Sequence, residues 1–211
     1  MNEGIAAMVV QWCLICLVWM GSYNRLLARF RLTQATTLAV LAACLLSAFS
    51  NWRMYVLPIE VNVSGTIVPM IISAWMWTCL VRPGQASYLA AAVITMTSVL
   101  FCIKRLFIWD PVLMFADETL ILPLLLTVLV FLFARHAEEQ VFLLFFSVTL
   151  FDISHSLSLW GKVTPFAIGS PFSQDVLWLS VLTWSLAWTV VAAIIHSRLV
   201  GSIKSKLQSH R

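Results

Sequence analysis

Charged side chains are scarce in this sequence. Only 10% of its 211 residues are Asp, Glu, Lys or Arg, whereas 61% are hydrophobic and the mean hydropathy is +0.94. A soluble domain has about 25% charged residues and could not hide this much apolar surface in one core. The shortage of charge excludes a soluble domain, a disordered or collagen-like chain and a nucleic-acid-binding protein. It predicts that lipid surrounds most of the chain.

The sequence also lacks the familiar catalytic motifs. It contains no H-E-x-x-H, no G-x-S-x-G, no P-loop and no dinucleotide fingerprint. No cysteine lies in a polar connection, because all five lie within apolar stretches: Cys13, Cys16, Cys44, Cys79 and Cys102. This placement argues against a disulfide scaffold, and the Cys13–Cys16 pair is interpreted as small packing surface. We therefore expect no cofactor and no metal, and the balance leans against an enzyme.

Long apolar stretches, separated by charged or turn residues, fill most of the chain. There are seven, each near the ~20 residues that a helix needs to cross the hydrocarbon layer. They cover residues 5–22, 32–50, 64–81, 85–103, 118–134, 140–160 and 175–197. The pattern predicts an all-α polytopic transmembrane bundle of about seven spans over residues 1–197. A short basic tail, residues 198–211, follows it.

The distribution of Lys and Arg predicts the orientation, since cytoplasmic connections carry an excess of these residues. With the tail in the cytoplasm, nine of them lie inside: Arg25, Arg29, Arg31, Arg82, Arg135, Arg198, Lys204, Lys206 and Arg211. Four lie outside: Arg53, Lys104, Arg105 and Lys162. The sequence thus predicts a multi-pass plasma-membrane protein with its N-terminus outside and its C-terminus in the cytoplasm.

A polar stripe interrupts the sixth stretch. Residues three and four apart share one face of a helix, which brings together Thr149, Asp152, His155 and Ser156. A charged group at this depth costs ~2.5–3.5 kcal/mol on insertion scales, so Asp152 needs a partner, and His155 is the nearest candidate. Three interpretations stay open: a structural or interfacial pair, a transport or proton-relay site, and a catalytic or metal site. The last would need a further ligand, and the spacing supplies none.

A second polar segment precedes the third stretch. Gly65 and Pro69 are helix breakers, Asn62 and Ser64 are potential helix caps, and Glu60 stands just before them. The segment is either a plain capped helix start with Glu60 among the headgroups, or irregular backbone that enters the membrane as a substrate mouth. In the second case span three could be re-entrant. Because both segments fall on the outer side, we expect Glu60, Asn62, Asp152 and His155 to converge.

Three features of the sequence suggest a known family. They are the N-V-S-G-T-I-V-P segment at residues 62–69, the D-P-V-L segment at residues 110–113 and the chain length. The sequence resembles the YphA-like family of small multi-pass membrane proteins from spore-forming Gram-positive bacteria. The resemblance implies a bacterial plasma membrane. It supplies no activity and no site residues.

Three classes of function remain. The favoured one is a non-enzymatic accessory or structural membrane component, whose partners are membrane lipid and other membrane proteins. The alternative is a small proton-coupled carrier or channel, with Asp152 and His155 as the titrating groups. The third is an intramembrane enzyme acting on lipid or peptide, with His155 as base.

Overall fold

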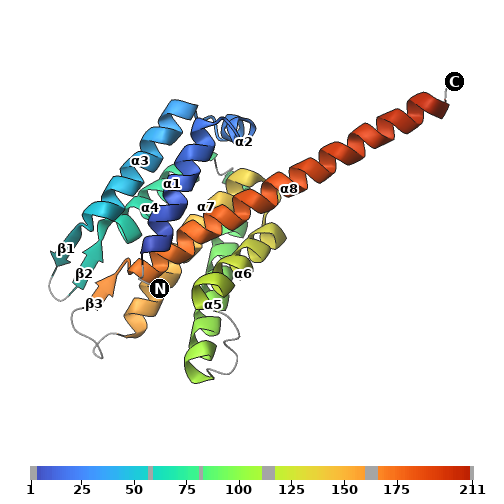
Figure 1. The fold of residues 1–211 in the computed structure, drawn as a ribbon. Helices are drawn as coiled ribbons and strands as arrows, with labels where there is room; N and C mark the ends of the chain where they lie inside the picture. Colours follow the sequence, from blue (N-terminus) through green and yellow to red (C-terminus); the bar gives the residue numbers. More distant parts are fainter. Residues whose placement is uncertain (1–3, 57–58, 81–82, 111–116, 160–165, 210–211) are drawn as a thin grey trace.

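The computed structural model describes residues 4–56, 59–80, 83–110, 117–159 and 166–209. This part of the chain is mostly helical and contains eight α-helices (Figure 1). Of the D-P-V-L segment only Asp110 is described, at the C-terminal end of α5, and positions 111–113 lie outside the described residues. The last two residues of the expected tail lie outside them as well.

Each of the seven apolar stretches corresponds to one helix, and three of these helices extend past the predicted bounds. The helices are α1 (Ile5–Trp19), α3 (Gln34–Ser50), α4 (Val68–Leu80), α5 (Ala86–Trp109), α6 (Glu118–Phe133), α7 (Ala137–Ser158) and α8 (Pro171–Ser209). A short helix, α2 (Asn24–Arg29), separates α1 from α3, and a 3₁₀ turn (Pro83–Gln85) precedes α5. Helix α8 continues past residue 197 through most of the expected tail, and its C-terminal part projects beyond the other helices in Figure 1.

A small β-sheet, which the sequence did not predict, lies at one end of the helices. Strands β1 (Arg53–Val56) and β2 (Ile59–Asn62) pair antiparallel, and β2 pairs in parallel with β3 (Phe166–Ile168). The expectation of a purely helical chain is therefore correct only in the main. Apolar and polar residues alternate in I-E-V-N, as in a strand, but the buried positions are the polar Glu60 and Asn62, and four residues are too few for a clear periodic signal.

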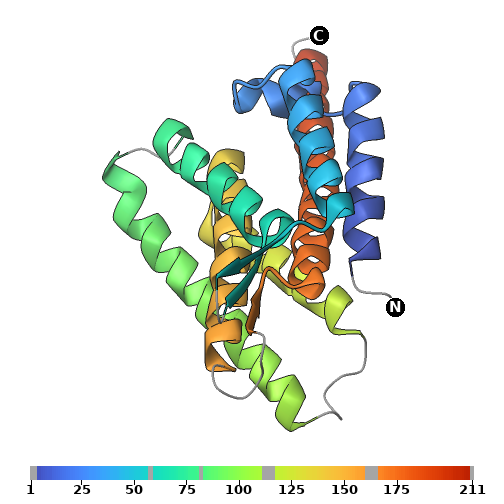
Figure 2. The ribbon, with the colours of Figure 1, turned by 90° about the vertical axis from the view of Figure 1, so that its left-hand side faces the viewer.

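Helix α8 is the central helix of the packing. It contacts α1, α6 and α7, while α4 and α5 pack against α7 (Figures 1 and 2). One apolar core is formed by the five helices α4, α5, α6, α7 and α8 and includes Leu126, Leu143 and Leu177. A second core joins α1, α2, α3 and α8 and includes Ala7, Leu14 and Trp178.

Large apolar side chains also cover the outside of the helices. Phe49 and Leu132 are 81% and 75% exposed, and Trp12, Leu124 and Val128 face outward as well. A helix that is apolar all round is typical of a membrane or of a deeply buried core. By length and composition, α5 and α7 are each long and apolar enough to cross a membrane. Shorter apolar helices of 10–17 residues in the described part of the chain are Ile5–Trp19, Gln34–Ser50, Val63–Cys79 and Glu118–Phe133.

Contacts between distant segments show which helix ends share a side. The hairpin between α3 and α4 pairs with β3 just before α8, and Asp175 at the start of α8 binds the start of α1. We call this side the sheet end. At the opposite end, the Tyr88 hydroxyl at the start of α5 donates to the Phe133 carbonyl at the end of α6, 2.7 Å away.

Asp175 completes the N-terminus of α1. Its two carboxylate oxygens accept the backbone N–H groups of Gly4 and Ala7, each at 2.7 Å, and its side chain is buried. The first N–H groups of a helix have no partner within the helix. A negative charge at this end also interacts favourably with the helix dipole. The exposed Asp117 caps α6 in the same way, and the hydrogen bond from the Thr119 backbone holds the pKa of Asp117 below its ordinary value.

We predict that Asp175→Ala lowers the free energy of unfolding in detergent by about 1–3 kcal/mol, because it leaves buried N–H groups without an acceptor. Asp175→Asn retains one acceptor oxygen and should cost less. The measurement is a denaturant titration followed by far-UV circular dichroism. Asp117→Ala is the control, with a smaller loss expected since water can replace the exposed carboxylate. An equal loss in both variants would contradict this role of Asp175.

Candidate functional site

Asp152 is the centre of a hydrogen-bonded cluster at the sheet end. Its Oδ2 accepts the backbone N–H of Gly169 at 2.6 Å, and its Oδ1 accepts the Ser170 hydroxyl at 3.2 Å. The Asp152 side chain is buried, and both partners belong to the connection between β3 and α8. The carboxylate therefore fixes the entry of α8 to α7.

The cluster extends from Gly169 to the segment before α4. Gln174 Nε2 donates to the Gly169 carbonyl at 3.4 Å, and Gln174 Oε1 lies 3.1 Å from the Ser64 hydroxyl. That hydroxyl is also 2.9 Å from Asn62 Oδ1, so its single proton is donated to one of the two oxygens at a time. Gln174, Ser64 and Asn62 are all buried. These contacts tie α8 to the chain that leads into α4.

The cluster reaches the protein surface through the β-hairpin. Asn62 Nδ2 donates to Asn51 Oδ1 at 3.1 Å, and Arg53 Nε donates to the same oxygen at 3.3 Å. Arg53 also forms an ion pair with Glu60, at 2.8 Å between Nη1 and Oε1. Arg53 is exposed, whereas Glu60 is only 6% exposed. We call the whole set, from Asp152 through Gly169, Gln174, Ser64, Asn62 and Asn51 to Arg53 and Glu60, the polar chain.

The turn into α4 shows how Asn62 acts. The Asn62 side chain accepts the Ser64 backbone N–H at 3.0 Å and so caps a π-helical turn (Val63–Ile67) that leads into α4. Pro69 occupies the first turn of α4, where a missing N–H is tolerated, and its carbonyl accepts the Ser73 hydroxyl at 2.8 Å. The segment that the sequence singled out is thus a strand followed by a π-helical turn. Such turns are rare and often mark functional sites.

Gly65 and Gly169 allow two backbones to touch beside Asp152. A Cβ atom at Gly65 would lie 2.5 Å from the Gly169 carbonyl oxygen. A Cβ at Gly169 would lie 2.5 Å from Thr66 Oγ1, and Gly169 has a φ of +81°. Only glycine fits both positions without a shift of the backbone. Among the described side chains, Thr66 Oγ1 is one of two buried polar atoms that have no hydrogen-bond partner; the other is Gln11 Oε1.

The four residues of the α7 stripe have separate roles. Asp152 and Ser156 both bind the β3 segment, since the Ser156 hydroxyl donates to the Ala167 carbonyl at 3.0 Å. Thr149 donates to the Phe145 carbonyl of its own helix at 2.8 Å. His155 is partly exposed and packs its ring against Phe151, with 6.0 Å between the ring centres. The hydrogen-bond partners of Asp152 are therefore Gly169 and Ser170, and the expectation that His155 is its partner is corrected.

The expected convergence takes a different form. Asn62 and Asp152 belong to the same polar chain, connected by Ser64, Gln174 and Gly169. Glu60 stands beside Ala167 in the sheet and is connected to the chain through Arg53. His155 makes no hydrogen bond to any of them within the described residues. In this part of the chain no group of three or more His, Cys, Asp or Glu side chains lies close enough to hold a metal ion.

The connecting residues were missed from the sequence because their partners are far away along the chain. Ser64 and Gln174 are 110 positions apart, and Gly169 was not singled out at all. Gln174 stood at the end of a predicted connection and Asp175 at the first position of the last predicted span, where polar residues need no explanation. The one available signal was the G-S-P sequence at residues 169–171, which is typical of a turn that leads into a helix.

The model of a known protein family, YphA-like integral membrane protein, matches residues 3–210. The chain belongs to this family of integral membrane proteins. The resemblance inferred from residues 62–69 is thereby confirmed, and so is the location in a membrane. Membership of the family explains the outward-facing apolar side chains of the helices. Comparisons with curated proteins and with solved structures gave no match.

We predict that Gly65→Ala lowers the free energy of unfolding by about 1–3 kcal/mol, the usual cost of overpacking a tight site. The added methyl group would press on the Gly169 carbonyl, which also belongs to the polar chain. Thermal unfolding in detergent measures the loss. Gly84→Ala is the matched control, because a Cβ at Gly84 meets no atom within 4 Å. Equal stability of the two variants would show that α4 and the β3–α8 connection do not pack as described.

Proposed function

We propose that this protein is a non-enzymatic accessory or structural component of the bacterial plasma membrane. In this proposal seven helices cross the membrane, the N-terminus lies outside, the C-terminus lies in the cytoplasm, and the partners are membrane lipid and other membrane proteins. The observation that supports it best is the use of Asp152, whose carboxylate oxygens both accept hydrogen bonds from the β3–α8 connection. A carboxylate whose two oxygens both accept hydrogen bonds from this connection holds α7 and α8 together.

The polar chain is better suited to structure than to proton transfer. Between Asp152 and Gln174 it passes through the backbone N–H and carbonyl of Gly169, and peptide groups do not release and rebind protons as side chains do. His155, the second titrating group that a carrier would need, does not hydrogen-bond to Asp152. Neither Asp152 nor His155 lines the large apolar cavity that lies between the two apolar cores. These features favour the structural role over the proton-coupled carrier and over an enzyme with His155 as base.

The arrangement of the helix ends supports the proposed threading. A chain that crosses the membrane seven times must put the start of α1, the hairpin before α4 and the segment before α8 on one side. These three segments meet at the sheet end. The excess of Lys and Arg in the connections at the opposite end supports a cytoplasmic location for that end. Helix α4 has 13 residues, about 20 Å of helix, so its crossing includes the π-helical turn before it.

We predict that Asp152 is energetically coupled to Ser170 and independent of His155. In a double-mutant cycle of Asp152→Ala with Ser170→Ala, stability in detergent should show a coupling of about 0.5–3 kcal/mol, as expected for side chains in contact. The parallel cycle of Asp152→Ala with His155→Phe serves as the matched control, and its two effects should simply add.

The same variants test the carrier. Proteoliposomes that contain the wild-type protein and a pH-sensitive dye should show no proton flux above that of empty vesicles. A flux that disappears in Asp152→Asn, while that variant stays as stable as the wild type, would replace the structural role by the carrier. Asparagine keeps the shape of Asp152 and removes its titrating proton.

We predict the threading from the split of nine to four in Lys and Arg. Reporter fusions at Arg211 and within residues 25–31 should read as cytoplasmic, and fusions within residues 53–56 should read as extracytoplasmic. The pairing of β1 with β2 requires only that residues 53–62 lie on one side. A cytoplasmic signal at residues 53–56 together with one at residues 25–31 would mean that α3 does not cross the membrane.

A further inference from the structure

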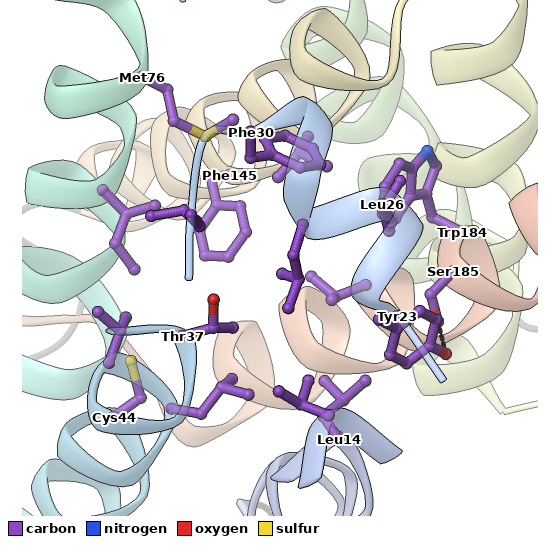
Figure 3. A pocket seen from close by; sticks show the side chains of 18 of the residues that line it. Leu14, Tyr23, Leu26, Phe30, Thr37, Cys44, Met76, Phe145, Trp184 and Ser185 are labelled. Carbon is purple, nitrogen blue, oxygen red and sulfur yellow. Dashed lines mark hydrogen bonds between the residues drawn. The ribbon is translucent and has the colours of Figure 1, made fainter. Parts of the chain in front are cut away.

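A large apolar cavity lies between the two cores. Its volume is about 540 Å³, within the ~300–1,000 Å³ that is usual for small-molecule sites. Residues from α1 to α4, α7 and α8 line it, among them Leu14, Phe30, Cys44, Met76, Phe145 and Trp184 (Figure 3). Tyr23 and Ser185 at its edge bond to each other at 3.0 Å, and Thr37 Oγ1 bonds to the Thr33 carbonyl at 3.0 Å. The wall therefore offers hydrocarbon and little free polar surface.

The cavity is accessible from the side, between α3 and α4. These helices lie close together at the sheet end, where the hairpin connects them, and diverge toward the opposite end (Figure 2). Three lining residues at this opening face outward: Val40, Ile71 and Trp75, which are 47%, 62% and 39% exposed. In an integral membrane protein this opening leads into the hydrocarbon of the bilayer. Water and polar solutes are excluded from such an entrance.

Helix α2 closes the wide end and carries positive charge. Leu26, Leu27 and Phe30 point their side chains to the cavity, while Arg29 and Arg31 are exposed. Arg31 stands between Phe30 and Leu32, both of which line the cavity. The Arg29 guanidinium lies 5.4 Å from the centre of the Trp188 ring, which in turn stacks on Trp184. Among the described side chains neither arginine has a carboxylate within ion-pair distance.

We propose that this cavity binds one anionic phospholipid from the leaflet on the α2 side. One acyl chain enters between α3 and α4 and fills the cavity, and the phosphate is held by Arg29 and Arg31. Guanidinium groups bind phosphate through paired hydrogen bonds, and a dry apolar cavity stabilises an acyl chain by burying its methylene groups. The proposal rests on the membrane location of the chain and on the proposed threading, which puts α2 at a membrane surface. It does not depend on the structural role of Asp152.

The two halves of the site select the occupant together. A free phosphate or a soluble anion could contact the arginines but would leave the cavity unfilled. A zwitterionic lipid could fill the cavity but would bring a positive choline group to Arg29 and Arg31. A transmembrane helix of a partner, about 10–12 Å across with its side chains, could place only about one turn in a cavity of about 540 Å³.

The test is lipid binding to the full-length protein in detergent, measured by native mass spectrometry. Phosphatidylglycerol and phosphatidylcholine with identical acyl chains are titrated in separate arms. We expect one phosphatidylglycerol per chain to bind at least tenfold more tightly than phosphatidylcholine. Glycerol 3-phosphate, which has the phosphate without the chains, should not displace it at equal concentration.

Two pairs of variants separate the chain from the headgroup. Thr37 points into the open space in Figure 3, so Thr37→Phe should place a ring there and weaken the binding of phosphatidylglycerol at least tenfold. Ala43→Phe, at an exposed position elsewhere on α3, should leave this binding unchanged. The double variant Arg29→Gln, Arg31→Asn should bind phosphatidylglycerol no more tightly than phosphatidylcholine. The exposed Arg135→Gln should leave the preference unchanged. If Thr37→Phe does not give a monodisperse protein, Val40→Phe at the opening replaces it.

Three results would overturn the proposal. Equal binding of the two lipids to the wild type would remove the role of the arginines. Binding that is unaffected by a correctly folded cavity-filling variant would place the lipid elsewhere on the surface. Displacement by glycerol 3-phosphate would mean that the site recognises phosphate alone.

Discussion

The hydrogen bond from the Gly169 backbone to the Asp152 carboxylate is the contact on which the arrangement at the sheet end depends. It fixes the point where the chain turns from β3 into α8, and α8 is the helix that both apolar cores share. Asp152 and Gly169 are both buried, and a buried backbone N–H group needs a hydrogen-bond partner from the protein. Asp152 supplies one partner, and the close approach of Gly65 lets the turn pack against the start of α4.

The length of the apolar stretches and the charged residues between them predicted the helices, because lipid imposes a simple rule on them. A stretch of about 20 apolar residues has few options other than a helix. Each predicted stretch accordingly corresponds to one helix, and the breaks at residues 51–53 and 135–139 fall at or near helix ends. The sheet was missed because its strands have three or four residues, and because β3 pairs with β2 across about a hundred positions.

The candidate site was only partly predictable for a related reason. The cost of burying a charge identified Asp152 even though its partner was unknown. The helix breakers Gly65 and Pro69 identified the segment from Asn62 to Pro69. The assignment of His155 as the partner relied on sequence distance along one helix. The folded chain instead brings Ser170 and Gly169 to the carboxylate, from a connection 17 and 18 positions away. Helical spacing identifies neighbours on the same helix, but it contains no information about which loop packs against that face.

The polar cluster and the apolar cavity follow from the same geometry. The hairpin and the π-helical turn hold α3 and α4 together at the sheet end, where the polar chain binds both segments to α8. Nothing comparable connects the two helices at the other end within the described residues. There α2 lies beside the gap (Figures 1 and 2), and Leu26, Leu27 and Phe30 line the cavity. Two helices that are clamped at one end and spread at the other enclose a wedge. In a bilayer a wedge with an apolar wall and a lateral opening is filled by hydrocarbon, since an empty space of this size would forfeit the dispersion contacts of its whole lining. The contacts that hold α3 and α4 together at the sheet end thus leave the wedge between them at the opposite end.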